Sequence, residues 1–279
     1  MPSITSKIIK SFIKMLLPTS LRHWYQKNKM EKLIAHFPKK VVEHHYGCTK
    51  LKIELADPLA KGWYDHDWDI LPEIKVLQDF GLQSGARVFD IGSHQGVVGL
   101  MLGKIVGETG NVIMIEPVAH NVKMCQRNIE LNGMYWVAVR EAAIAAQDGR
   151  IMFNNCWNGS AAVTSDYGGV REVEAISINS LAIQFGMPAC VMIDVEGFEC
   201  LALLGASDVL AKQVNWCVEV HVGCGLEASG GSVSQLLGFF PNDRFIKFIH
   251  SDGDKISIPF NDVSPEIMKK RFFLTAISK

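Results

Sequence analysis

The spacing of apolar residues divides the chain into two parts. In the first, isoleucine, phenylalanine and leucine recur at helical intervals over residues 4–17, with lysines between them, and Pro18 ends the run. This spacing predicts a basic amphipathic helix. Further elements are expected in this part: a helix at 21–37, strand-like pieces near Val41 and Leu51, and a helix at about 71–80.

In the second part, from residue 85 on, short apolar runs alternate with helical ones. The expected strands are 87–90, 111–116, 136–143, 151–153, 189–194 and 215–221, and the expected helices are 97–106, 119–132 and 198–204. Such alternation is typical of βαβ units, so we predict an α/β fold with a doubly wound, mostly parallel sheet. Three segments follow: a basic amphipathic helical arm (1–40), an N-terminal extension with a lead-in helix (41–84), and a ligand-binding domain (85–279).

Composition supports a well-buried domain but hides an uneven charge. Of the 279 residues, 48% are hydrophobic, and the net charge is −1. The arm carries nine basic residues and one acidic residue, Glu31, for a net charge of +8, so the remainder carries −9. This balance excludes a surface built wholly for nucleic acid. The arm has three interpretations: it docks on the domain or a second subunit, lies on an anionic membrane surface, or binds an acidic partner.

Cysteine usage and hydropathy bear on the compartment. The seven cysteines are odd in number and scattered without a C-x-x-C pair, which indicates neither a disulfide framework nor a zinc knuckle. Apolar runs stay well short of the roughly 18 residues of a membrane span, and lysines interrupt any signal-peptide core. We therefore expect a cytoplasmic protein, with attachment to a membrane surface as the alternative.

A glycine turn follows the first strand of the expected sheet. The segment 88–96 runs from a buried strand through Asp90 to a turn with Gly92 and Gly96, and a helix follows. Free amides at a helix start bind anions. His94 stands where a dinucleotide turn needs its second glycine, which favours a ligand without phosphates. S-adenosylmethionine (SAM) is such a ligand, because its carboxylate suits the turn amides and its ammonium group suits Asp90.

The second strand of the sheet ends in an acidic residue. Glu116, followed by Pro117, comes some two dozen positions after the glycine turn, where a carboxylate can accept both ribose hydroxyls. Alternatively, Asp90 caps a helix and Glu116 is a solvated strand end. On the ligand interpretation, adenine lies near Ala143. The expected cofactor contacts are Asp90, Gly92, Ser93, His94, Gly96, Glu116, Pro117, Ala143 and Asp194.

A second group of carboxylates surrounds the ends of the next two strands. Asp194, Glu196 and Glu199 lie about one turn, and Glu219 and His221 share one face of the following strand. We expect Asp194 or His221 to remove a hydroxyl proton, with Glu196 and Glu219 orienting that base or binding a cation. Capping of a helix N-terminus explains Glu199 well and Glu196 in part, and a hydrogen-bonded structural role explains His221. Because capping and hydrogen bonding account for these residues without a bound ion, a divalent metal is not favoured.

Three other segments are candidates for contact with ligands. The glycine-bearing stretches 154–171 and 223–232 are candidate substrate loops. The aromatic stretch 63–69 could close over the cofactor. Its alternative is a packed aromatic turn with Asp69 as a helix cap.

Taken together, these motifs resemble the FkbM family of SAM-dependent methyltransferases. The resemblance rests on Phe-Asp-Ile-Gly (89–92), Ile-Glu-Pro (115–117), Ile-Asp-Val-Glu-Gly-Phe-Glu (193–199) and Val-Glu-Val-His (218–221). It implies a seven-stranded class I methyltransferase sheet and O-methylation of a hydroxyl on a small molecule or glycan. The chain departs from the family at Met192, where lysine is usual, and at Asn179, where aspartate is usual.

Other functions remain open at this point. A reductase that uses NAD(P) would share the sheet and Glu116, but His94 argues against it. A nucleic-acid methyltransferase would use the basic arm as an anchor, but the domain is net acidic and lacks an Asn/Asp-Pro-Pro-aromatic motif. The departures at Met192 and Asn179 would suit a protein that binds SAM without transferring methyl.

Overall fold

The computed structural model describes residues 32–154 and 170–279. The amphipathic helix expected at 4–17 lies outside the described residues, as do most of the expected helix 21–37 and the middle of the candidate loop 154–171. Residues 32–35 are helical.

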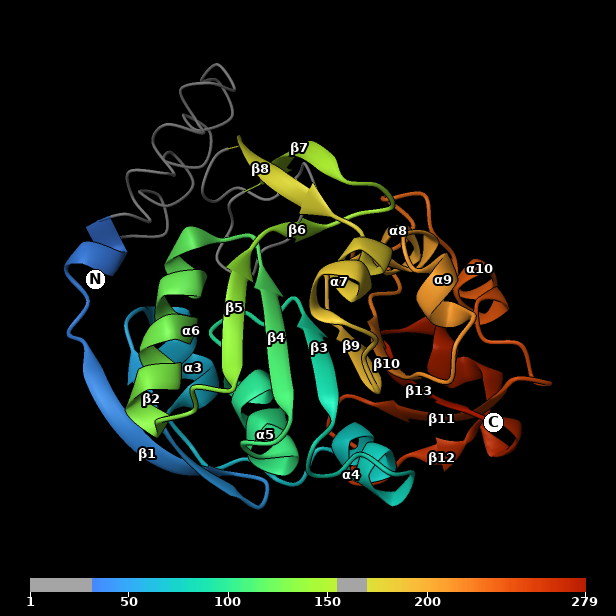
Figure 1. Ribbon diagram of the computed structural model, residues 1–279, viewed down its shortest axis with the longest axis horizontal. Helices are drawn as coiled ribbons and strands as arrows, with labels where there is room; N and C mark the ends of the chain where they lie inside the picture. The colour runs from blue at the N-terminus through green and yellow to red at the C-terminus, as the bar shows by residue number, and fades with distance from the viewer. Residues whose placement is uncertain (1–31, 155–169) are drawn as a thin grey trace, which may run out of the picture.

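A central sheet of eight strands organises the molecule (Figure 1). Its order is β12-β11-β13-β10-β9-β3-β4-β5, and β10, β9, β3, β4 and β5 are mutually parallel, whereas β13 is antiparallel to both of its neighbours. The bounds are Arg87–Ile91 (β3), Asn111–Glu116 (β4), Val137–Glu141 (β5), Cys190–Ile193 (β9), Asn215–Val220 (β10), Phe245–Ser251 (β11), Ile258–Pro259 (β12) and Phe272–Ser278 (β13). The two-residue edge strand β12 is the addition to the seven strands that the resemblance implies.

Helices cover both faces of this sheet. The helices α4 (Pro72–Asp79), α5 (Val97–Val106) and α6 (Ala119–Asn132) pack on one face, and α7 (Ile178–Phe185), α8 (Glu199–Leu204), α9 (Ser207–Leu210) and α10 (Val233–Gly238) pack on the other. Two 3-10 helices, Phe260–Asp262 and Pro265–Lys269, lie between β12 and β13. The doubly wound α/β fold predicted from the sequence is confirmed.

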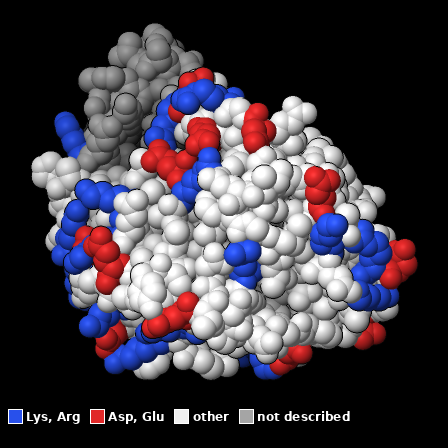
Figure 2. Space-filling model, in the orientation of Figure 1, with Lys and Arg blue, Asp and Glu red and all other residues white. Residues whose placement is uncertain are grey.

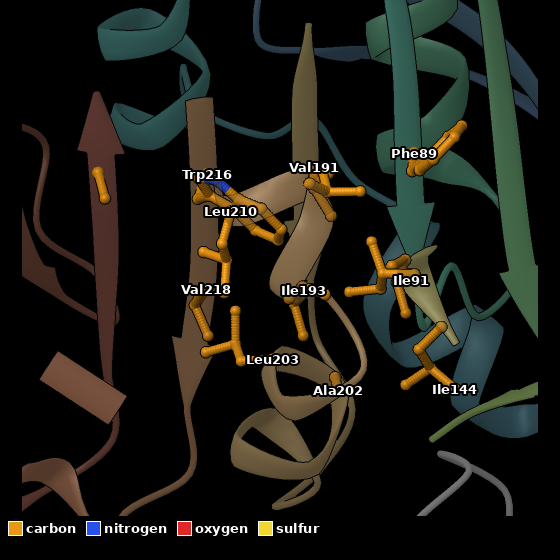
Figure 3. Close-up of a cluster of buried hydrophobic side chains, with 14 of the residues drawn as sticks. Phe89, Ile91, Ile144, Val191, Ile193, Ala202, Leu203, Leu210, Trp216 and Val218 are labelled. Carbon is orange, nitrogen blue, oxygen red and sulfur yellow. The ribbon is translucent and has the colours of Figure 1, made fainter. Parts of the chain in front are cut away.

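The short strands are apolar because both of their faces are buried. Alternate residues of β3 and β9, such as Phe89 and Val191, point into the core shared with α8 and α9, together with Trp216 and Val218 of β10 (Figure 3). Burying one large apolar side chain contributes about 1.5–3 kcal/mol. This core fixes the strand ends that carry the site.

The segment before the central sheet packs against it rather than standing apart. The hairpin of β1 (Lys40–Tyr46) and β2 (Thr49–Leu55) lies against α5 and α6 and is followed by α3 (Pro58–Tyr64). Tyr46 and Ile53 belong to the same buried cluster as Leu100 of α5. Within the described residues, no helix has the length and hydropathy needed to span a membrane.

A second, three-stranded sheet lies at the carboxyl edge of the central one. It contains β6 (Ala143–Ile144), β8 (Val170–Ile176) and β7 (Gly149–Asn154), in that order. The single strand expected at 136–143 is therefore wrong. The chain breaks pairing with β4 after Glu141, and Ala143 pairs with Ala175 of β8 instead.

Candidate active site

The glycine turn joins β3 to α5 at the point where the strand order reverses, between β3 and β9. Open α/β sheets bind ligands at such a point. Gly92 has φ +85°, and a Cβ added to it would lie 1.6 Å from the carbonyl oxygen of Asp194. Only glycine fits there. Gly96 also has positive φ and is the N-cap of α5.

Glu116, at the end of β4, holds the turn in place. Its Oε2 accepts a hydrogen bond from the His94 amide at 2.9 Å, and its Oε1 accepts from the Val118 amide and from Nδ2 of Asn121. Burial raises the pKa of Glu116 to about 7. Glu116 is thus a buried acceptor and not a solvated strand end, and its oxygens retain lone pairs for a ligand hydroxyl.

Asp90 is a buried carboxyl group that borders a cavity. Burial raises its pKa to about 7, although the Gly99 amide opposes that shift. Among the described residues, nothing hydrogen-bonds to its Oδ2. The N-cap residue of α5 is Gly96, but the Asp90 carboxyl group accepts from the Gly99 amide in the first turn of that helix, as the capping interpretation of the sequence expects. A buried oxygen without a partner is costly and is suited to a cationic ligand group.

Two cavities meet at the turn. The smaller, of about 30 Å³, lies between the strand ends and is lined mainly by apolar groups, including Pro117, Ala143, Phe153 and Phe198. The larger, of about 440 Å³, runs from Ser93 and His94 toward Glu219 and Arg271. Both are bordered by Gly92, Asp194 and Glu196. The glycine turn therefore lies between a small apolar slot and a larger, more polar cavity.

His221 lies at the centre of the second carboxylate group. Its Nδ1 is 2.7 Å from Oε1 of Glu199, and its Nε2 lies 3.7 Å from Asp194, 3.5 Å from Glu196 and 3.6 Å from Glu219. Burial opposes the imidazolium, but the hydrogen bond with Glu199 and the charge of Asp194 prevail and raise the pKa of His221 to about 9. At neutral pH His221 therefore holds its proton.

Asp194 differs from His221 because it opens onto the larger cavity. Its side chain is 53% exposed there. Desolvation by the surrounding protein and the charge of Glu219 raise the pKa of Asp194 well above its usual range. Burial likewise raises the pKa of Glu219, which lies 3.2 Å from Arg271. Of the two groups expected to act as the base, Asp194 is the one that opens onto the larger cavity.

Glu199 lies in the first turn of α8, as the capping interpretation of the sequence expects, and it also contacts His221. It is fully buried, and its Oε1 accepts from the Gly197 amide as well as contacting His221. The turn requires glycine at position 197, because this residue has φ +105° and packs against Gly225. One ligand atom from each of Asp194, Glu219 and His221 falls within 4.8 Å of the others, so these residues fit a divalent cation.

The helix α3 docks onto the glycine turn. Its N-cap, Asp57, accepts hydrogen bonds from Gln95 at 2.6 Å and faces His120 at 2.9 Å. The Tyr64 hydroxyl lies 2.7 Å from Nδ1 of His94, and the Trp63 ring centroid is 5.0 Å from that of His94. The start of the aromatic stretch 63–69 therefore covers the turn.

Two expectations about neighbouring segments are wrong. The N-cap of α4 is Leu71, and Asp69 instead lies at the surface, 3.3 Å from Lys255. The described loop 223–232 lines neither cavity, because it turns inward: Leu226 is fully buried and Gly225 contacts the Gly197 turn.

Several residues that line the larger cavity are not among those expected from the sequence. They come from elements outside the motifs: Glu73, Asp252, Arg271 and Phe273, whereas Tyr64 and Trp68 belong to the aromatic stretch 63–69 expected to cover the cofactor. The apolar runs at 245–251 and 272–278 are a sequence signal for the strands that bring Asp252, Arg271 and Phe273.

Comparison with known proteins agrees with this geometry. A family model described as protein-L-isoaspartate(D-aspartate) O-methyltransferase matches residues 73–156, which include the glycine turn and Glu116. No curated protein matches the chain. The strand order, the turn and this match define the chain as a class I SAM-dependent methyltransferase, which confirms the enzyme class and the cofactor predicted from the sequence.

Solved structures similar to the chain are also methyltransferases. FkbM from Methylobacillus flagellatus KT is 15% identical over 68% of this chain and 43% of its own, with a TM-score of 0.45. A SAM-dependent O-methyltransferase from Thermotoga maritima is 12% identical over 86% and 77%, with a TM-score of 0.45. Aeropyrum pernix fibrillarin with bound SAM is 11% identical over 86% and 83%, with a TM-score of 0.44. The chain thus spans less than half of the FkbM chain.

Proposed function

We propose that the protein transfers a methyl group from SAM to a hydroxyl oxygen of a small molecule or glycan. The observation that carries this proposal is the place of Asp194. This carboxylate ends β9 where the two cavities meet, touches the glycine turn through its backbone, and faces Glu219 and His221 through its side chain. A base there lies beside the ligand turn and open to an acceptor.

The residues of the two cavities fit the parts of SAM, which supplies an electrophilic methyl group on its sulfonium. The apolar slot around Ala143 and Phe153 suits adenine, and Glu116 suits the ribose hydroxyls. The unpartnered Oδ2 of Asp90 suits the ammonium group, and the amides of the turn suit the carboxylate.

An alcohol is a poor nucleophile near neutral pH and needs a base within hydrogen-bond reach, which contributes roughly 10²- to 10⁴-fold. We assign this role to Asp194. His221, kept protonated by Glu199, is the positive charge that holds Asp194, Glu196 and Glu219 together around it. His221 is then a positioning residue.

Turnover assays test the proposal directly. Formation of S-adenosylhomocysteine should depend on a hydroxylated acceptor, and the product should carry an O-methyl group by mass spectrometry and NMR. Asp194→Asn should lower kcat at least 100-fold, whereas Asp243→Asn, at an exposed site away from both cavities, should not. A chain that binds SAM but forms no methylated product with any hydroxyl acceptor is a SAM-binding protein instead.

A further inference from the structure

The larger cavity adjoins a second one that leads away from the catalytic cluster. This second cavity, of about 370 Å³, lies between the segments 66–73 and 250–255. The two share a boundary formed by Trp68, Leu71, Glu73, Asp252 and Phe273. Together they offer an acceptor more room than one sugar ring occupies.

A row of side chains across three strands connects the cluster to the far cavity. Glu219 of β10 pairs with Phe273 of β13, and Phe273 pairs with His250 of β11. Cross-strand partners project to the same face, and neighbouring strands lie about 4.8 Å apart, so the row is about 10 Å long. Phe273 stacks on His250 with parallel rings 4.7 Å apart, and Glu73 of α4 stands beside His250.

The lining of these two cavities is strongly acidic. Only two cationic side chains, Arg271 and Lys255, occur among the described residues that line them. Arg271 is shared by Glu219 and Asp252, and Lys255 pairs with Asp69. Neither is left for an anionic ligand. The carboxylates are nine: Asp67, Asp69, Glu73, Asp90, Asp194, Glu196, Glu219, Asp252 and Asp254.

Glu73 is the carboxylate that points to a ligand. It is 4% exposed, it borders both cavities, and its Oε2 has no hydrogen-bond partner among the described residues. His250 Nε2 lies 3.2 Å away, at ion-pair distance when His250 is protonated but without hydrogen-bond geometry, and the other ring nitrogen of His250 contacts Ser257. A buried carboxylate oxygen without a hydrogen bond is destabilising, and a cationic donor that binds to it removes this cost.

We propose that the acceptor is a small polyhydroxylated molecule that carries a protonated amine, such as an amino sugar glycoside. Its reacting hydroxyl lies at Asp194, its ammonium group lies at Glu73 beyond the row of Glu219, Phe273 and His250, and Phe273 and Trp68 pack against the sugar rings. The assignment of the hydroxyl rests on the proposed function, whereas the amine site does not. Phosphorylated and carboxylated acceptors are repelled by the same carboxylates.

Calorimetric binding to the full chain loaded with S-adenosylhomocysteine tests the amine site. The probes are kanamycin A and its fully N-acetylated derivative, which keeps the hydroxyls and loses the charges. We expect the amine form to bind at least tenfold more tightly. Glu73→Gln should remove that preference, and the matched variant Glu266→Gln, at an exposed position outside both cavities, should preserve it.

Competition on the unmodified chain covers the case in which Glu73→Gln fails to fold. Spermidine should displace kanamycin A, and triacetylspermidine should not. Equal binding of charged and acetylated probes, or no binding of either at millimolar concentration, overturns the amine site. Methylation of neutral polyols with no preference for amines would leave O-methyl transfer intact and refute this inference alone, whereas selective amine binding without any turnover would do the reverse.

Discussion

At the scale of single residues, the site depends on backbone conformations with positive φ, which residues with a Cβ rarely adopt. Besides Gly92, two residues with a Cβ have positive φ in the part of the chain that the structure describes, His94 at 48° and Glu196 at 50°. Both border the larger cavity. Such conformations cost about 1–3 kcal/mol each and persist where the surroundings dictate them, as the bond from the His94 amide to Glu116 does here. They also concentrate at functional sites.

Gly92 gives the sharpest test of the ligand turn. Gly92→Ala places a Cβ against the carbonyl oxygen of Asp194, so the turn must move away from β9. We expect the affinity for SAM, measured by calorimetry, to fall at least 100-fold. Gly62→Ala is the matched control, because a Cβ there meets nothing within 4 Å. Unchanged affinity in Gly92→Ala would refute SAM binding at this turn.

The buried acids predict how SAM binding depends on pH. Burial raises the pKa of Asp90 to about 7, so this group is mostly ionised at pH 8 and mostly protonated at pH 6. Because the carboxylate is the form that attracts the ammonium group, affinity should fall about tenfold from pH 8 to pH 6. Glu116, also near 7, adds to the same trend. Asp90→Asn should bind weakly and lose most of this dependence; a wild-type affinity that is flat with pH contradicts the assignment.

Chelation by EDTA tests whether a divalent cation binds among the carboxylates around His221. With the pKa of His221 raised to about 9, a divalent cation at neutral pH must displace a proton, which weakens its binding about 100-fold at pH 7. We therefore expect turnover at pH 7 to survive exhaustive EDTA treatment. Loss of turnover that Mg²⁺ or Mn²⁺ restores would make Asp194, Glu219 and His221 ligands of a metal.

At the scale of elements, sequence pattern predicts what is local and fails where distant segments meet. The helices α5 and α6 and the strand β4 begin and end where their periodicity indicates. The carboxylates at the ends of β4 and β9 could be placed together because parallel strands end at one edge of the sheet. By contrast, β13 inserts antiparallel between β10 and β11, and no local signal dictates that pairing. Arg271 and Phe273 therefore could not be assigned to the site in advance.

The helix α3 is another element whose contribution depends on docking. Tyr64→Phe removes only the hydroxyl that contacts His94. We expect this variant to bind SAM three- to tenfold more weakly, since a hydrogen bond contributes about 0.5–1.5 kcal/mol. Tyr135→Phe, which removes an exposed hydroxyl bonded to Glu108, is the matched control. Equal affinities in the two variants would mean that α3 covers the turn without positioning it.

At the scale of the whole molecule, charge is mixed on the surface and segregated along the chain. The face in Figure 2 shows Lys, Arg, Asp and Glu interspersed, with basic side chains gathered along the edge of β1 and β2. The cavities, in contrast, are acidic, and so is the chain after residue 40, with a net charge of −9 against +8 for residues 1–40. We therefore expect the basic arm to be attracted to the acidic remainder of the chain.

This balance predicts how the full chain behaves toward membranes. If the acidic domain neutralises the charge of the basic arm, the arm should attract an anionic surface only weakly. Screening of charges over about 8 Å at 0.15 M ionic strength weakens this attraction further. We expect no co-sedimentation with phosphatidylserine vesicles at 0.15 M salt. A variant with glutamine at Lys7, Lys10 and Lys14 separates the outcomes. Sedimentation of the wild type that high salt weakens and this variant loses would place the arm on a membrane, because polybasic segments contribute about 1 kcal/mol per basic residue near such a surface.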